Sequence, residues 1–190
     1  MRKFNENLIE EGVRKIIEGI GDDVNRDGLK DTPKRISGMY RKILDGLDHP
    51  EEEVKCNVKL FDEETDGKMV MIKNIPFYSF CEHHIIPFFG KLSIAYIPKD
   101  NKILGISKLV RIARVFAKRL QVQERLTKEI VDAISETVPN DGVAVRMEME
   151  HLCMSIRGVR TSGATTLTMR MTGLFKKNSE YRQEFMEAIK

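Results

Sequence analysis

Apolar residues recur at helical spacing near the start of the chain. In residues 6–20 the apolar side chains fall three or four positions apart, at Leu8, Ile9, Val13, Ile16 and Ile17, which is typical of an amphipathic helix. Asp31-Thr32-Pro33 predicts the start of a second helix, with Thr32 as its N-cap and Pro33 at the first helical position. Asp48-His49-Pro50 then predicts a break.

The rest of the chain alternates between strand-like and helix-like stretches. Three strands are predicted over residues 54–61, 69–80 and 91–97, with turns over 62–67 and 98–101. Two helices are predicted over residues 107–120 and 123–138, and Pro139-Asn140-Asp141-Gly142 predicts a turn. Two strands over 143–153 and 165–175 and a helix over 180–189 complete an order that favours an α+β fold with a mainly antiparallel sheet.

The stretch 143–153 shows the clearest alternation. One face of the predicted strand carries Val143, Val145, Met147, Met149, His151 and Cys153. The other face carries Arg146, Glu148 and Glu150. Because side chains two apart on a strand point the same way, His151 and Cys153 are expected to close one apolar face together.

Composition narrows the class of protein. The chain has 190 residues, which suits one domain with an added N-terminal segment, and 41% of them are hydrophobic. The net charge of +3 permits a small anionic ligand but does not indicate nucleic-acid binding. No apolar run approaches the length of a membrane span, and the start does not resemble a signal peptide. Three cysteines do not suggest a disulfide framework, so a cytoplasmic location is expected.

Histidine and cysteine gather in two short clusters, Cys81-Glu82-His83-His84 and His151-Leu152-Cys153. Thiolate and imidazole are ligands that zinc prefers, and Cys-x-x-His is a spacing at which a tight turn brings both residues to one ion. A buried cysteine in an apolar face is often just part of the core, but the two clusters together favour one split zinc site.

These residues allow two arrangements. A closed site would use Cys81, His84, His151 and Cys153 and would be structural. An open site would use Cys81, His84 and Cys153, leaving one position for water, with His83 and His151 as proton carriers beside it. The residues alone do not decide between the two.

Several basic residues are candidates for binding an anion. Ser107 is a plausible helix N-cap, yet Lys108 and Arg111 follow in the first turns, where cations oppose the helix dipole. This is either a tolerated cost on a solvated face or a sign that a phosphate binds at the helix end. Arg157 and Arg160 follow Cys153 closely and add positive charge near the proposed metal, and Arg35 is a weaker candidate.

Gln123 and Glu124 open the second of the two central helices. An acidic residue near a helix N-terminus is favourable for purely structural reasons. The functional alternative is that the carboxylate accepts paired N–H bonds from the edge of a guanine base.

Taken together, the motifs closely resemble the GTP cyclohydrolase I family. The resemblance covers the chain from about Gly28 to the C-terminus and rests on several motifs in order: Thr32-Pro33-Lys34-Arg35-Ile36, Phe80-Cys81-Glu82-His83-His84, Ala95-Tyr96-Ile97-Pro98, Gly105-Ile106-Ser107-Lys108, Gln121-Val122-Gln123-Glu124-Arg125-Leu126, His151-Leu152-Cys153-Met154, Arg157-Gly158-Val159-Arg160 and Gly173-Leu174-Phe175.

The resemblance implies a tunnelling fold, in which two helices pack on one face of an antiparallel sheet, preceded by N-terminal helices. It suggests a helical segment over residues 1–50 and a catalytic domain over residues 51–190. It also implies a homodecamer made of two pentamers, with active sites between subunits. The segment before Gly28 is short, so a regulatory arm is not expected.

By motif match, the resemblance assigns Cys81, His84 and Cys153 to zinc and gives His83 and His151 the handling of protons. It assigns Glu124, helped by Gln123, to the guanine. The ribose and triphosphate would be held by Ser107, Lys108, Arg111, Arg157 and Arg35. Because family sites lie between subunits, Arg35 is expected to serve a neighbouring subunit's pocket.

The reaction implied is hydrolysis and rearrangement of GTP to 7,8-dihydroneopterin triphosphate and formate, an early step in folate and pterin synthesis. Two alternatives are an enzyme of the same fold with another substrate or an opened-ring product, and a structural zinc protein with a closed site. The signature of zinc nucleobase deaminases is missing. Met169 and Arg170 stand where the family more often has small or apolar residues, and nothing in the sequence explains Arg170.

Overall fold

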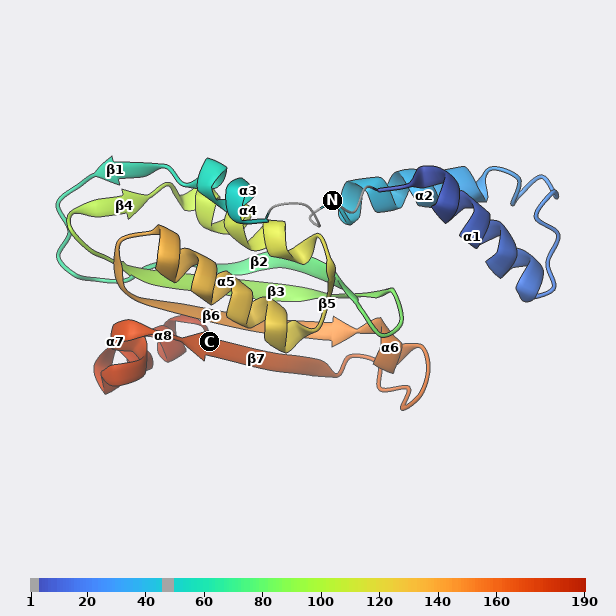
Figure 1. Cartoon of the computed structure of the whole chain (residues 1–190). Helices are drawn as coiled ribbons and strands as arrows, with labels where there is room; N and C mark the ends of the chain where they lie inside the picture. The colour runs from blue at the N-terminus through green and yellow to red at the C-terminus, as the bar shows by residue number, and fades with distance from the viewer. Residues whose placement is uncertain (1–3, 46–49) are drawn as a thin grey trace. The chain divides into compact units, whose positions relative to one another are not determined.

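The chain forms two compact units, Met1–Asp48 and His49–Lys190 (Figure 1). The computed structural model describes residues 4–45 and 50–190. The predicted break at Asp48-His49-Pro50 lies outside the described residues except for Pro50. Within the described ranges, no helix combines the length and apolar character needed to cross a bilayer.

The first unit is built from two helices, α1 (Glu6–Gly19) and α2 (Thr32–Ile43). Val13 and Ile17 of α1 are buried together with Val24 of the connecting segment, so the apolar stripe found in the sequence faces a small core. The predicted N-cap of the second helix is one residue late. Asp31 is the N-cap, because the Thr32 N–H already donates to the carbonyl of Leu29 and Thr32 is helical.

The second unit is organised around a five-stranded sheet. The strands lie in the order β5 (Leu120–Gln121), β2 (Val70–Cys81), β3 (Ile86–Pro98), β6 (Asn140–His151) and β7 (Thr165–Met171). Neighbouring strands are antiparallel except for the short parallel pair β2 and β5. A separate two-stranded sheet pairs β1 (Leu60–Asp62) with β4 (Lys102–Leu104). The predicted α+β fold with a mainly antiparallel sheet is confirmed.

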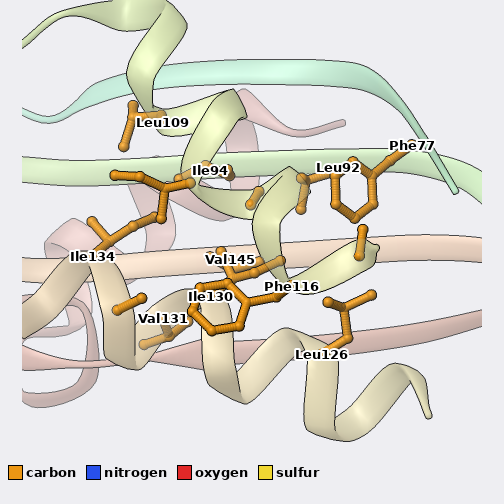
Figure 2. Close-up of a cluster of buried hydrophobic side chains, with 14 of the residues drawn as sticks. Phe77, Leu92, Ile94, Leu109, Phe116, Leu126, Ile130, Val131, Ile134 and Val145 are labelled. Atoms are coloured by element: carbon orange, nitrogen blue, oxygen red, sulfur yellow. The ribbon is translucent and has the colours of Figure 1, made fainter. Parts of the chain in front are cut away.

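Helices cover both faces of this sheet in different places (Figure 1). On one face lie α4 (Ile106–Ala117) and α5 (Gln123–Thr137), the two helices that the apolar spacing predicts, with α3 (Pro50–Asn57) beside α4. Their buried residues interdigitate with those of the strands, as Leu109, Ile130, Ile94 and Val145 do in Figure 2. The other face is partly covered by α7 (Gly173–Lys177) and α8 (Ser179–Ala188), whose Phe175 and Phe185 are fully buried.

The strand predicted over residues 54–61 is wrong in its first half, which is helix α3. Pro50 followed by three glutamates is a favourable helix start, because Pro suits a first turn and acidic side chains suit the N-terminal dipole. Val54 is 2% exposed in the core beneath α3. The apolar residues of this stretch therefore follow a helix before they follow the short strand β1.

Two further boundaries differ near the end of the chain. The turn predicted at Pro139–Gly142 is shorter, because β6 begins at Asn140, whose side-chain amide donates to the carbonyls of Ser135 and Val138. The last strand ends at Met171 rather than Phe175. Gly173 then starts α7 at a φ of 51°, packed so tightly against the Asp141 carbonyl that a Cβ would lie 1.9 Å from its oxygen.

Gly90 marks the closest approach of β3 to β6. A Cβ at this position would lie 2.1 Å from the carbonyl oxygen of Glu148 and 2.9 Å from the Cα of Met149, and both neighbours are backbone. Because the backbone of a central strand cannot move aside cheaply, Gly90→Ala is expected to reduce the free energy of unfolding by about 1–3 kcal/mol or more. Denaturant titration of both proteins measures this, and an unchanged midpoint would contradict the close packing.

Candidate active site

The first histidine–cysteine cluster sits in the turn between β2 and β3. Cys81 ends β2 and is 5% exposed. Its carbonyl accepts the N–H of Ile85 at 2.8 Å and that of His84 at 3.4 Å, while the Glu82 N–H donates to the carbonyl of Gln121 at 3.0 Å. The turn therefore brings positions 81 and 84 onto one side, as the Cys-x-x-His spacing predicts.

Cys153 does not lie on the strand with His151. β6 ends at His151, and Cys153 is the second residue of the short helix α6 (Leu152–Ser155). The prediction that the two side chains share one strand face is wrong, because the chain turns into a helix between them. Cys153 still packs against the helix-covered core, from its place in α6 at the end of the sheet where the β2–β3 turn also lies (Figure 1).

Three side chains from these two segments form a compact group of metal-ligand atoms. The sulfurs of Cys81 and Cys153 and a ring nitrogen of His84 all lie within 4.8 Å of one another. Cys81 Sγ and His84 Nδ1 are 4.0 Å apart, within about half an ångström of the ~3.6 Å expected for tetrahedral zinc with a sulfur bond of ~2.3 Å and a nitrogen bond of ~2.1 Å. These residues could hold a metal ion with three protein ligands, which leaves a coordination position open.

The chemistry of the two sulfurs agrees with a cation between them. Burial raises the pKa of the Cys153 thiol, and the neighbouring Cys81 sulfur raises it further, while the Arg157 guanidinium lowers it. Two thiolates side by side repel each other in a partly desolvated place. A divalent cation would offset that repulsion, so the donor set fits a metal better than it fits two free thiols.

His83 lies beside this group, where the open arrangement expects a proton carrier. Its Nδ1 is 3.7 Å from Cys81 Sγ. Its ring stands edge-on to that of His84, with ring centroids 6.2 Å apart and an interplanar angle of 81°. His83 is exposed, so it combines closeness to the ligand sulfur with access to solvent.

Two contacts hold the ring of His151. Its ring stacks on Phe88 of β3, with centroids 4.7 Å apart and an interplanar angle of 5°. Its Nε2 lies 2.8 Å from the Oε1 of Gln123. Burial lowers the pKa of this histidine, and the charge of Glu124 acts in the opposite direction. The metal-ligand group of the described residues does not include His151, so the geometry favours the open arrangement over the closed one.

Comparison with known proteins agrees with this geometry. The family model for GTP cyclohydrolase I matches residues 9–190. The chain belongs to the GTP cyclohydrolase I family. Proteins named GTP cyclohydrolase 1 include relatives from Bacillus subtilis strain 168, 45% identical over all of this chain and 98% of the relative, and from Desulforamulus reducens, 49% identical over 98% of each. A relative of the same name from Pelotomaculum thermopropionicum is 47% identical over 98% of each chain.

The resemblance to GTP cyclohydrolase I assigns Gln123 to the guanine, but the side chain is not free to reach a ligand. Gln123 is 1% exposed. Its amide nitrogen donates to the carbonyl of Thr166 at 2.9 Å and to Thr168 Oγ1 at 3.0 Å, and its oxygen faces His151. In this structure the amide is therefore engaged within the protein, and the role of Gln123 beside the guanine stays a prediction. Glu124, the next residue of α5, is exposed, and its position stays compatible with binding a base.

The anion-binding candidates of the GTP cyclohydrolase I motifs are divided between two places. Arg157 and Arg160 are exposed in the segment after α6, and Arg157 is close enough to Cys153 to lower the pKa of its thiol. Ser107, Lys108 and Arg111 lie in the first half of α4, whose 12 residues span about 18 Å. The far end of α4 leads into β5, which pairs with Phe80 and Cys81. One chain therefore places these three residues away from its own cluster (Figure 1).

The structure describes the surroundings of three further polar residues, Ser107, Arg35 and Arg170. Gly105 is the N-cap of α4, so Ser107 is the second helical residue and not the cap. Arg35 is in the first unit, where its guanidinium lies 3.6 Å from the carboxylate of Asp31. Arg170 is exposed on strand β7, and nothing in the structure explains it.

The sequence did not reveal two supports of the site. Phe88 was outside every strand that the pattern predicts, although it is paired in register with His151 across β3 and β6. Arg125 pairs with Glu82, the residue between Cys81 and His83, and its Nε donates to Gln121 Oε1 at 2.9 Å. The pairing of Glu82 with Arg125 could not be predicted from the sequence, because the two residues are 43 positions apart.

Proposed function

We propose that this chain is a GTP cyclohydrolase that converts GTP and water to 7,8-dihydroneopterin triphosphate and formate, with Zn²⁺ held by Cys81, His84 and Cys153. The observation that carries the proposal is a three-ligand group with an open position, beside a histidine that is not a ligand, in a chain of the GTP cyclohydrolase I family. Free thiols at the site fit a reducing compartment, and the cytoplasm remains the predicted location.

Zn²⁺ at this position would supply a hydroxide at neutral pH, because zinc lowers the pKa of bound water to ~7. His83 and His151 are the groups that would give protons to and take protons from the opening imidazole ring of the substrate, at their own ring nitrogens. The exposed carboxylate of Glu124 would accept the adjacent N1–H and N2–H donors of guanine. Fixing both ends of GTP would hold its C8 at the metal.

The ribose and triphosphate are assigned to the basic residues Lys108, Arg111, Arg157 and Arg35 and to the hydroxyl of Ser107. Lys108 and Arg111 stand near the start of α4, away from the cluster of the same chain. A complete site then requires two chains, with the start of α4 in one facing the metal ligands of the next. This supports a tunnelling fold whose subunits join into rings, and we propose the decamer of two pentamers that the resemblance implies.

A shared site predicts complementation between two inactive subunits. Lys108→Glu should fail to turn over GTP at low concentration, and Cys153→Ala should lack the metal. The two variants are co-expressed with different tags and purified as mixed oligomers. A site is intact when its metal ligands come from a Lys108→Glu chain and its α4 residues come from a Cys153→Ala chain. Random mixing should therefore restore activity at about a quarter of the sites. The matched control is His151→Ala mixed with Cys153→Ala, where both defects lie in one half-site, so no activity should return. Equal recovery in both mixtures would contradict the shared site.

The direct test of the function is incubation of purified, zinc-loaded protein with GTP while formate and the oxidised, fluorescent pterin are measured. Both products in equal amounts support the proposal. Bound zinc without either product would point to another substrate or to a structural site. Formate without pterin would mean that the ring opens but that the later rearrangement does not occur here.

A further inference from the structure

Gln123 is a buried primary amide with an unusually complete set of partners. It is the first residue of α5 and is 1% exposed. Leaving any of its hydrogen-bonding groups unpaired there would cost on the order of 1–3 kcal/mol. The partners around each end of the amide therefore determine which way it faces.

The nitrogen end faces three acceptors. Gln123 Nε2 is 2.9 Å from the Thr166 carbonyl oxygen, 3.0 Å from Thr168 Oγ1 and 3.3 Å from the Met147 carbonyl oxygen. Carbonyl oxygens accept and cannot donate. The end of the amide that lies against β6 and β7 must therefore be NH₂, and the oxygen must be the end that faces His151.

The hydroxyls next to the amide keep this orientation. Thr127 Oγ1 donates to the backbone carbonyl of Gln123 at 2.7 Å and lies 2.7 Å from Thr168 Oγ1. With the Thr127 proton used in this way, Thr168 donates to Thr127 and accepts from the Gln123 amide. Thr127 is fully buried, so water does not compete for these bonds. A rotated amide would place NH₂ against His151 and its oxygen against two carbonyls.

The orientation of Gln123 fixes the proton on His151. An amide oxygen is an acceptor only, so the contact of 2.8 Å requires His151 Nε2 to carry a hydrogen. In the neutral ring, Nδ1 is then the free acceptor. The parallel stack on Phe88 fixes the plane of the ring. A half-turn that restores that plane would put the carbon Cε1 where Nε2 now stands, and the contact with the Gln123 oxygen would be lost.

We infer that Gln123 is a positioning residue, which holds the His151 imidazole with Nε2 protonated so that Nδ1 is the nitrogen that exchanges protons with the substrate. The inference rests on the proposed function, because it assigns a partner to one of its proton carriers. It replaces the role in guanine binding. Partners that orient a functional histidine in this way typically change activity by about 10–100-fold when removed.

Gln123→Met tests this assignment, because it keeps the length of the side chain but removes the acceptor. We expect kcat to fall by about 10–100-fold while KM for GTP stays within about twofold, since binding of the base is untouched. A guanine-binding Gln123 would instead raise KM with less effect on kcat. A raised KM with little change in kcat would overturn the inference. Unchanged kinetics of Gln123→Met, measured beside an active wild type, would also overturn it. An inactive wild type would instead contradict the proposed function.

Gln121→Met is the matched control for lost stability. Gln121 is also 1% exposed, and its amide donates to the Phe116 carbonyl and to Glu129 while accepting from Arg125. The same substitution there removes a similar buried network, which holds Arg125 beside Glu82 but does not contact His151. Equal losses of kcat in both variants, with equal shifts in thermal unfolding, would attribute the effect to the fold and overturn the inference.

Two further readouts separate positioning from structure. In a His151→Ala background, Gln123→Met should cause no additional loss of kcat, because Gln123 acts through that histidine. The ring nitrogen-15 resonances of His151, assigned by their absence in His151→Ala protein, should show the proton on Nε2 in the wild type and a mixture of tautomers in Gln123→Met. A proton on Nδ1 in the wild type, or an additive loss of kcat, would overturn the inference.

Discussion

Replacing Cys153 with alanine is expected to abolish both metal binding and turnover. Its sulfur belongs to a group of three ligand atoms within 4.8 Å of one another, and two remaining ligands do not hold zinc in the three-ligand geometry of catalytic sites. Zinc content should fall from about one ion per chain to near zero after dialysis. Without the several kcal/mol of charge stabilisation that the ion supplies, turnover should fall about a thousandfold or more.

The chain provides its own control for this experiment. Cys56 is exposed in α3 and is outside the metal-ligand group. Cys56→Ala should therefore retain both zinc and turnover, which would show that the loss in Cys153→Ala is not a general effect of removing a thiol. Zinc measured by elemental analysis at full stoichiometry in Cys153→Ala would mean that the ligand set is different from the one proposed.

The candidate metal-ligand group could be predicted from the sequence because part of its geometry is local. A turn of four residues places Cys81 and His84 side by side whatever the rest of the fold does, and the structure has this turn. Cys153 belongs to the group, as predicted, but not because it shares a strand face with His151. Its place beside Cys81 comes from the start of α6 and from the pairing of β3 with β6, and neither is encoded in the spacing of His151 and Cys153.

The long elements were predicted for a related reason. Helices α4 and α5 and strand β6 each carry an apolar pattern over 12 to 15 residues. This length is enough to distinguish the helical period of about 3.6 residues from the strand period of about two. The short strands β4 and β5 have three and two residues and exist because partners far along the chain supply their hydrogen bonds. Residues 50–57 were ambiguous, since a short apolar run fits a helix as well as a strand.

The role of Gln123 shows what a motif cannot provide. The pair Gln123-Glu124 suggested one task for two neighbouring residues, yet successive positions of a helix face different directions. One side chain points into the sheet against Thr166 and Thr168, and the other is exposed. The distinction depends on burial and on strand pairing, so it could be made only from the structure.

His151→Ala separates the catalytic site from a structural one. In the open arrangement His151 is not a ligand, so the variant should keep its zinc and lose about 10²–10⁴-fold in turnover, the usual contribution of a positioned acid or base. In a closed arrangement it would be the fourth ligand, and zinc would be lost with it. Because alanine also removes the ring stacked on Phe88, His151→Gln should be measured beside it as a variant that keeps a polar side chain of similar reach.

Both variants should retain zinc while failing to release formate. Loss of zinc in both would establish the closed site and would remove the basis for the proposed chemistry, since no coordination position would remain for water. Retained zinc with nearly normal turnover would leave His83 as the proton carrier, consistent with its ring nitrogen 3.7 Å from the Cys81 sulfur. In that case His83→Ala, and not His151→Ala, should show the large loss of turnover.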